Sequence, residues 1–348
     1  MVVIDGSFGE GGGQVLRTSL ALSALLGREV RIENIRAGRA RPGLAAQHLA
    51  GVQATAQVCG ARVEGARIGS TELSFSPGHI RGGAFRFDVG TAGATTLVLQ
   101  TILPCLLVAR EASAVQITGG TNVLWSPPQE YLAHVFLPAI AAMGASARIE
   151  CLRPGFYPKG GGRLEARVTP LSAPLRPLAW SERGELRSLT AFSVAEERLP
   201  AHIVRRQIEG AREALGPVGL RAETAHPESA SPGTMLTIAA RFERGAAGFS
   251  DSGERGKPAE TVGREAGEQA ARFLQGHASV DMHLADQLLL HAAIAGGETV
   301  YVTEHITEHL RTNAWVLAQF LEAEIEIDED TGRVTVHGVG LPAGGGAI

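Results

Sequence analysis

The chain has 348 residues, of which 44% are hydrophobic and 20% are charged, a composition typical of a globular protein with a hydrophobic core. Its 32 basic and 36 acidic residues give a net charge of −4, which excludes binding of nucleic acid or membranes through an overall positive charge. The 44 glycines follow no three-residue period, so a collagen-like fibre is excluded as well.

Several features predict a cytoplasmic protein without a membrane partner. The first residues lack the basic segment and apolar segment of a secretory signal, so none is expected. The longest apolar run, residues 95–109, contains Gln100 and Pro104 and is too short to span a bilayer. Three cysteines are an odd number, match no zinc spacing and indicate a reducing compartment. They are Cys59, Cys105 and Cys151.

The order of predicted elements repeats three times along the chain. Residues 16–64, 95–150 and 284–328 each contain an apolar helix, a glycine break, a strand, a second helix and a closing strand. Apolar residues recur every three or four positions in the helices and alternate in the strands. This order predicts an α/β fold (α+β, two-layer) built from three βαβαββ-type units with helices on one sheet face.

The spacing of the repeats locates an insertion. The first two units begin about 80 residues apart and the last two about 190 apart, which leaves roughly 100 additional residues between them. We therefore expect a small inserted α/β domain at residues 184–276. The large domain would comprise residues 1–183 and 277–337, and residues 338–348 would form a flexible, Gly-rich tail.

A glycine-rich loop opens the chain. Residues 9–13 (GEGGG) precede the first helix and fit neither the dinucleotide fingerprint nor the Walker loop. Successive backbone N–H groups before a helix nevertheless favour anions. Glu10 is a candidate ligand for Mg²⁺ or Mn²⁺, because a divalent ion offsets repulsion between a carboxylate and phosphates. The alternative is a tight strand–helix turn with an exposed glutamate.

A cluster of arginines follows the next predicted strand. Arg36, Arg39 and Arg41 lie in a Gly/Pro loop, where guanidinium groups can bind phosphates through two hydrogen bonds each. Arg17 on the first helix would point toward this loop, and Gln47 beyond it could add a phosphate contact. The alternative is a solvated basic loop.

The candidate nucleophile is a histidine. Neither lysine of the chain lies in the Lys-x-Asp-Gly box of lysine nucleotidyltransferases, whereas His309 is predicted at the start of a helix, beside positive backbone dipoles. A neutral imidazole nitrogen can attack phosphorus. His305-Ile-Thr-Glu-His309 also fits the H-x-x-E-H pattern of zinc proteases. That alternative requires both histidines on one helix, and a strand–helix junction is predicted instead.

Six segments, in order along nearly the whole chain, resemble the RNA 3'-terminal phosphate cyclase family. The resemblance implies three repeated units with an inserted domain, and ATP-dependent conversion of an RNA 3'-phosphate to a 2',3'-cyclic phosphate. It places the family's AMP–histidine intermediate on His309. The segments are residues 5–17 (DGSFGEGGGQVLR), 35–44 (IRAGRARPGL), 93–101 (GATTLVLQT), 155–162 (GFYPKGGG), 283–287 (HLADQ) and 308–313 (EHLRTN).

The resemblance also implies an ATP site and an RNA partner, but predicts neither the RNA sequence nor the oligomeric state. Two alternatives stay open: a cyclase-like protein of ribosomal RNA processing that lacks the chemistry, and an enolpyruvyl transferase built from similar units. The first lacks the adenylylated histidine, and the second would need no nucleotide. The implied ATP-binding residues are Gln100, His283, Leu284, Ala285, Asp286 and Gln287.

Overall fold

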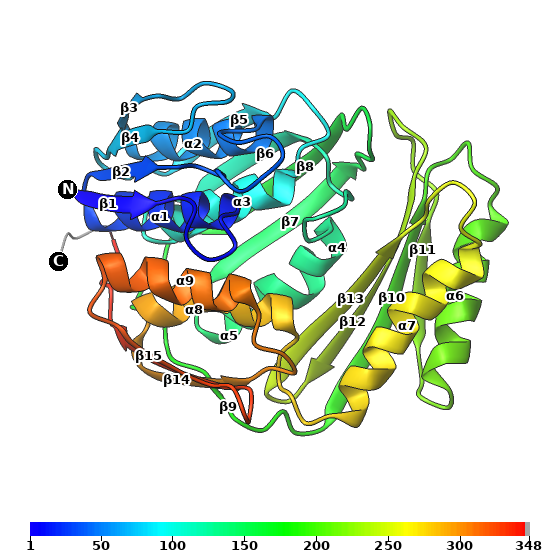
Figure 1. Ribbon diagram of the computed structural model, residues 1–348. Coiled ribbons are helices and arrows are strands. Elements are labelled where there is room, and N and C mark those ends of the chain that lie inside the picture. Colours follow the sequence, from blue (N-terminus) through cyan, green and yellow to red (C-terminus); the bar gives the residue numbers. More distant parts are fainter. Residues whose placement is uncertain (345–348) are drawn as a thin grey trace.

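The computed structural model describes residues 1–344, which form four four-stranded sheets with helices packed against them (Figure 1). The predicted mixed α/β class is confirmed. No helix among these residues is long and apolar enough to cross a membrane.

Three of the sheets share one strand order. In each, the first two strands pair in parallel and the other neighbours pair antiparallel. In sheet order the strands are β1 (Val2–Asp5), β2 (Val30–Glu33), β4 (Leu73–Ser76) and β3 (Arg62–Glu64); β5 (Gly83–Asp88), β6 (Ser113–Gly119), β8 (Gly162–Thr169) and β7 (Ser146–Arg153); β9 (Ala179–Trp180), β14 (Gly296–Val302), β16 (Arg333–Val339) and β15 (Glu324–Asp328).

The helices that accompany these sheets pack against one another and form the main core. Helix α1 contacts α2, α3 and α9, so elements from both ends of the chain meet around it. The helices are α1 (Gly13–Leu26), α2 (Ala46–Cys59), α3 (Thr95–Leu107), α4 (Gln129–Tyr131), the π-helical turn η1 (Leu132–Phe136), α5 (Leu137–Ala142), α8 (Met282–Ile294) and α9 (Glu308–Phe320).

Helix α3 is buried on nearly all sides, and most of its residues are apolar. Twelve of its 13 residues are buried, and Gln100 alone remains partly exposed. The Gln100 side chain lines the small pocket described below.

The fourth sheet has a core of its own, which includes Ile208, Ile238 and Val262. In Figure 1 this sheet and its two helices lie at one side of the molecule, in green to yellow. The sheet order is β11 (Arg221–Ala225), β10 (Leu186–Ala195), β12 (Thr234–Phe242) and β13 (Gly245–Ser252), and the helices are α6 (His202–Leu215) and α7 (Ala259–Gln275).

A flexible tail was predicted from residue 338, but the first residues of that segment are ordered parts of the fold. Strand β16 continues to Val339, and the Leu341 side chain is buried. The Leu341 amide donates to the carbonyl of Ile294 at 2.8 Å. A Cβ added to Gly338 would lie 2.2 Å from the Ala295 carbonyl oxygen, so glycine here allows a close approach of two backbones. The part of the predicted tail at 345–348 lies outside the described residues.

Candidate active site

The site forms where loops from the first sheet meet helix α9. The carboxyl ends of the parallel strands β1 and β2 lie at one sheet edge, and the loops that follow them carry Glu10 and Arg39. His309 is in the first turn of α9, whose N-cap residue Thr307 accepts a hydrogen bond from the Leu310 amide at 3.1 Å. The predicted position of His309 at a helix start is confirmed.

The His309 ring has an oxygen acceptor beside each nitrogen. Nε2 lies 2.5 Å from a carboxylate oxygen of Glu10, and Nδ1 contacts the side-chain oxygen of Gln14. The Asp286 carboxylate lies 3.9 Å from Nδ1, beyond hydrogen-bond distance. The ring is thus held at both nitrogens while 43% of its side chain remains exposed.

Two arginines interact with the carboxylates that lie near this histidine. Arg39 donates to a carboxylate oxygen of Glu10 at 2.6 Å. Arg17 is half-buried, and burial lowers its pKa although the charges of Asp286 and Glu10 raise it. A guanidinium group is chemically suited to binding a phosphate.

The remaining predicted phosphate contacts do not touch His309 directly. Arg36 donates to the Gly43 carbonyl at 2.7 Å, within its own loop, and Arg41 is exposed. Gln47 accepts from the Ala94 amide at 3.2 Å and joins α2 to the start of α3. Arg36 and Gln47 thus bond to backbone groups of the loop and of the α3 N-terminus.

His48 lies beneath the glycine loop and is buried. A Cβ added to Gly13 would lie 2.3 Å from its Nε2, so glycine is required for this approach. Burial, followed by the charges of Arg17 and Arg36, lowers the pKa of His48 to about 3. The neutral ring accepts a hydrogen bond from the Ala45 amide through Nδ1 at 3.1 Å.

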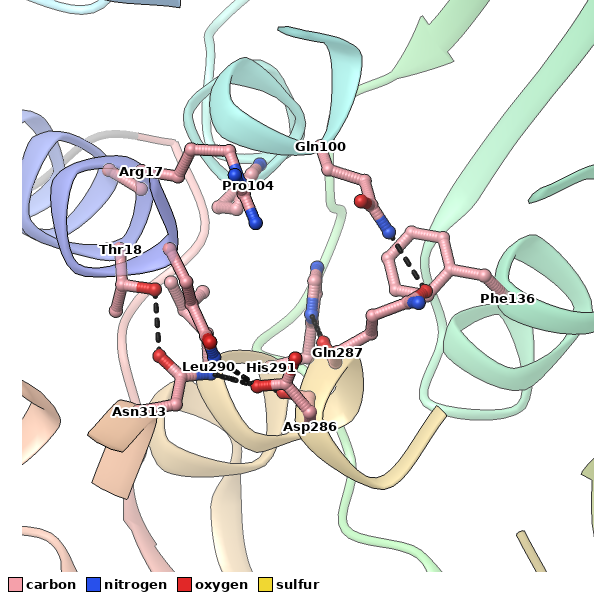
Figure 2. A pocket seen from close by; sticks show the side chains of 12 residues that line it. Arg17, Thr18, Gln100, Pro104, Phe136, Asp286, Gln287, Leu290, His291 and Asn313 are labelled. Atoms are coloured by element: carbon pink, nitrogen blue, oxygen red, sulfur yellow. Dashed lines mark hydrogen bonds between the residues drawn. The ribbon is translucent and has the colours of Figure 1, made fainter. Parts of the chain in front are cut away.

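A small pocket of about 60 Å³ lies beside the histidine, between α1, α3 and α8 (Figure 2). Gln100 donates to the side-chain oxygen of Gln287 at 2.8 Å across it. Asp286 also lines this pocket, and burial raises the pKa of its carboxyl. The structure thus brings together three of the predicted ATP-binding residues.

The other predicted ATP-binding residues differ in accessibility. His283 is exposed at the start of α8, whereas the side chains of Leu284 and Ala285 are fully buried in the core. The Leu284 amide donates to the N-cap side chain of Asp281, and the Ala285 carbonyl accepts from Tyr301. Any contact of these two residues with a ligand is therefore limited to backbone atoms already engaged in the fold.

The zinc-protease alternative does not fit this geometry. His305 precedes α9, so it shares no helix face with His309. Within residues 1–344, no three His, Cys, Asp or Glu side chains come together as a metal-binding group. Glu10 offers one partly exposed carboxylate, which suits a divalent ion that takes its other ligands from water and phosphates.

His291, on the pocket wall, should make stability depend on pH. Burial lowers its pKa to about 4 from the ordinary 6.5. The unfolded chain therefore binds a proton below pH 6.5 that the folded protein excludes, so stability is full above this pH and falls with acidification. Between pH 7 and 5 this residue should cost about 2 kcal/mol of unfolding free energy.

Urea unfolding at both pH values measures this effect. The variant His291→Leu should lose less stability on acidification than the wild type, by about the same 2 kcal/mol. An equal loss in both proteins would contradict the assignment.

The fold and site thus define a mixed α/β protein whose site holds a histidine, arginines and a carboxylate, residue types that can serve phosphoryl or nucleotidyl transfer. Residues 8–327 match the family described as RNA 3'-terminal phosphate cyclase. A protein of that name from Archaeoglobus fulgidus is 45% identical over 330 residues, 94% of this chain and 98% of the relative. One from Pyrobaculum aerophilum is 45% identical over 345 residues, 97% of this chain and 99% of the relative.

The chain belongs to the RNA 3'-terminal phosphate cyclase family, as its sequence motifs predicted. Among solved structures, the enolpyruvyl transferase NikO from Streptomyces tendae matches with a TM-score of 0.39 and 12% identity, over 98% of this chain and 49% of that chain. A similarity this low supports no argument about fold or function.

Residues that the sequence analysis did not identify complete the site. Gln14 contacts His309, and Asn313 donates to the Asp286 carboxylate at 3.1 Å. Gln14 lies within the first quoted motif and Asn313 ends the last one, so the motifs contained them without indicating a role.

Proposed function

We propose that this protein converts an RNA 3'-terminal phosphate to a 2',3'-cyclic phosphate with ATP, through a covalent AMP adduct of His309. The observation that carries this proposal is the His309 ring at the N-terminus of α9, with its Nε2 beside Glu10, whose carboxylate also pairs with Arg39. Family membership favours the same reaction.

In the first step His309 Nε2 attacks the α-phosphorus of ATP. A nitrogen–phosphorus bond forms, the bond to the β-phosphate oxygen breaks, and pyrophosphate leaves with the electron pair. Arg17 and Arg39 would neutralise the charge that develops on this leaving group. Backbone N–H groups at the start of α9 favour negative charge at the same place.

The second and third steps move AMP to the RNA and release it. An oxygen of the RNA 3'-phosphate attacks the adenylyl phosphorus, and His309 Nε2 recovers its lone pair. The neighbouring 2'-oxygen then loses its proton and attacks the 3'-phosphorus, so the ring closes and AMP leaves. The last attack is favoured because nucleophile and phosphorus belong to one ribose.

Most of the predicted binding residues have a place in this scheme, whereas the side chains of Leu284 and Ala285 are buried in the core and have none. Gln100, Asp286 and Gln287 line the pocket and would bind the nucleoside. His283 is exposed at the start of α8, the helix that carries Asp286 and Gln287, and would add a contact. Arg36, Arg41 and Gln47 would hold the RNA phosphate. Glu10 would hold Mg²⁺ or Mn²⁺, and the bound ion would supply charge stabilisation to the phosphates.

The wider architecture and location are part of the proposal. The shared strand order of three sheets supports three repeated units, and the second core cluster, between Leu189 and Ala278, supports an inserted domain. The three cysteines are free thiols, which agrees with a cytoplasmic location.

The proposed reaction is tested with an RNA that carries a labelled 3'-phosphate. Incubation with ATP and Mg²⁺ or Mn²⁺ should make the label resistant to phosphatase, and omission of ATP should abolish this resistance. A protein that binds the RNA but never protects the label would be a binding protein of the same family.

Removal of Glu10 or Arg39 should impair catalysis without unfolding the protein. Both are partly exposed loop residues, so Glu10→Ala and Arg39→Ala should change the unfolding free energy by less than about 0.5 kcal/mol. We expect AMP transfer to His309 to fall about 100-fold in each.

The matched control is Arg31→Ala, which removes an arginine paired with Glu33 at 2.8 Å on β2. It should retain wild-type transfer. A large decrease in melting temperature in the Glu10 and Arg39 variants would show that these residues are structural instead.

A further inference from the structure

Two loops carry the most exposed aromatic side chains of residues 1–344. Trp125, in the loop after β6, is 96% exposed, and Tyr157, in the loop between β7 and β8, is 76% exposed. The other two tyrosines are buried, and the other two tryptophans are buried or half-buried. Leu124 beside Trp125 is exposed as well. Large apolar side chains gathered in water indicate a surface that another molecule covers.

The two loops are joined and held firmly by buried groups. The backbone amides of Thr121 and Asn122 donate to the Gly155 carbonyl at 3.0 and 3.2 Å. The Gly155 amide donates in return to the Thr121 hydroxyl at 3.0 Å. The Asn122 side chain donates to the buried carboxylate of Glu130 at 2.7 Å. The exposed aromatic side chains therefore extend from a fixed frame.

Positive charge accompanies these aromatic side chains. Residues 151–164, which contain the loop between β7 and β8, include Arg153, Lys159 and Arg163 but no acidic residue. Within residues 1–344, none of these three side chains lies within 4.0 Å of a carboxylate oxygen. Nε of Arg153 is buried and has no hydrogen-bond partner in the same part of the chain. The local charge of about +3 is thus available to an anionic ligand.

The loop between β7 and β8 adjoins residues that the proposed function assigns to the RNA phosphate. A Cβ added to Gly160 would lie 2.7 Å from the Ala92 Cα, so this loop packs directly on the loop that follows β5. One residue further, a Cβ added to Gly93 would lie 3.0 Å from the Gln47 Cβ. The aromatic and basic side chains therefore begin close to the place where the RNA phosphate would be held.

We infer that Trp125, Tyr157 and Lys159 form a binding surface for the single-stranded RNA nucleotides that precede the 3'-terminal phosphate. Bases would stack on the two aromatic rings, and the Lys159 ammonium group would contact a phosphate. Aromatic rings combined with unpaired cations suit single-stranded RNA, which offers both base faces and phosphates. Stacking accepts every base, so this surface would bind RNA of any sequence. The inference rests on the proposed function, which makes RNA the substrate.

The experiment measures binding of a fluorescently labelled, single-stranded RNA of ten nucleotides with a 3'-phosphate, by anisotropy and without ATP. Trp125→Ala and Tyr157→Ala should each raise the Kd about 10-fold, because each removes one stacking surface. Lys159→Gln should reduce the slope of log Kd against log salt concentration by about 0.7, because one phosphate contact is lost. Lys159→Arg keeps the charge and should keep the wild-type slope.

The control is Leu186→Ala, which truncates an exposed apolar residue at the start of β10. The loop between β7 and β8 adjoins the other end of that strand, where Phe156 packs with Val194, so this control should bind RNA like the wild type. AMP transfer from ATP to His309 uses no RNA and is measured separately in every variant.

Unchanged RNA binding in Trp125→Ala, Tyr157→Ala and Lys159→Gln would overturn the inference and assign the surface to a different partner. A wild-type protein that binds no RNA would overturn it as well. If the wild type binds RNA through these residues but forms neither an AMP adduct nor a cyclic phosphate, the proposed function fails and the RNA surface stands.

Discussion

His309→Ala is expected to abolish formation of the cyclic phosphate, with a decrease of about 1,000-fold or more. The methyl group of alanine offers no atom that can attack phosphorus, and no other histidine lies against both Glu10 and Gln14 within residues 1–344. The fold should persist, because 43% of the His309 side chain is exposed and Thr307 caps the helix independently. Release of pyrophosphate from ATP measures the first step, and resistance of the RNA label to phosphatase measures the last.

His305→Ala is the matched control. His305 is an exposed histidine four residues earlier, before α9 begins, and its loss should leave both readouts near the wild-type level. Equal losses in the two variants would indicate that the whole segment, and not the His309 ring, supports the reaction.

The second large effect is expected from a change in the substrate. An RNA with a 3'-phosphate on a terminal 2'-deoxyribose still presents its phosphate to the arginines, so it should accept AMP from His309. Ring closure should be undetectable, because the 2'-oxygen that attacks the 3'-phosphorus is missing. The AMP-capped RNA should accumulate and be visible on a sequencing gel as a product extended by one nucleotide.

Two other outcomes would be informative. If the deoxy-terminated RNA receives no AMP while His309 is labelled normally, the 2'-hydroxyl is needed for RNA binding. If the deoxy-terminated RNA is converted to a product without AMP, the reaction is not cyclisation through an activated phosphate.

The sequence predicted best what local patterns determine. The helix start near His309 was predicted from the apolar period, and the N-cap Thr307 that the structure shows lies only two residues before it. The position of Gln100 on α3 could also be predicted from the local sequence, because one amide in an otherwise apolar run indicates contact with a polar environment. The arginine loop was located correctly, but the different roles of Arg36 and Arg39 depend on which acceptor each side chain reaches.

Contacts between distant segments were beyond such patterns. Gln14 and His309 lie 295 positions apart, as do Thr18 and Asn313, so no periodicity could pair them. Strand β9 has two residues, too few to show alternation, and its pairing with β14 depends on the tertiary fold. At Gly338 the composition indicated a loop, whereas the glycine is needed for close packing of β16 against the end of α8.

The most direct test of the central claim is to locate the AMP on the protein. The wild-type chain is incubated with Mg²⁺ or Mn²⁺ and ATP labelled at the α-phosphate, denatured, digested and mapped by mass spectrometry. We predict one adduct, labile in acid and stable in alkali, on the peptide that contains His309. An adduct on Lys159, Lys257 or His305, or a chain that forms cyclic phosphate with no adduct at all, would contradict the mechanism.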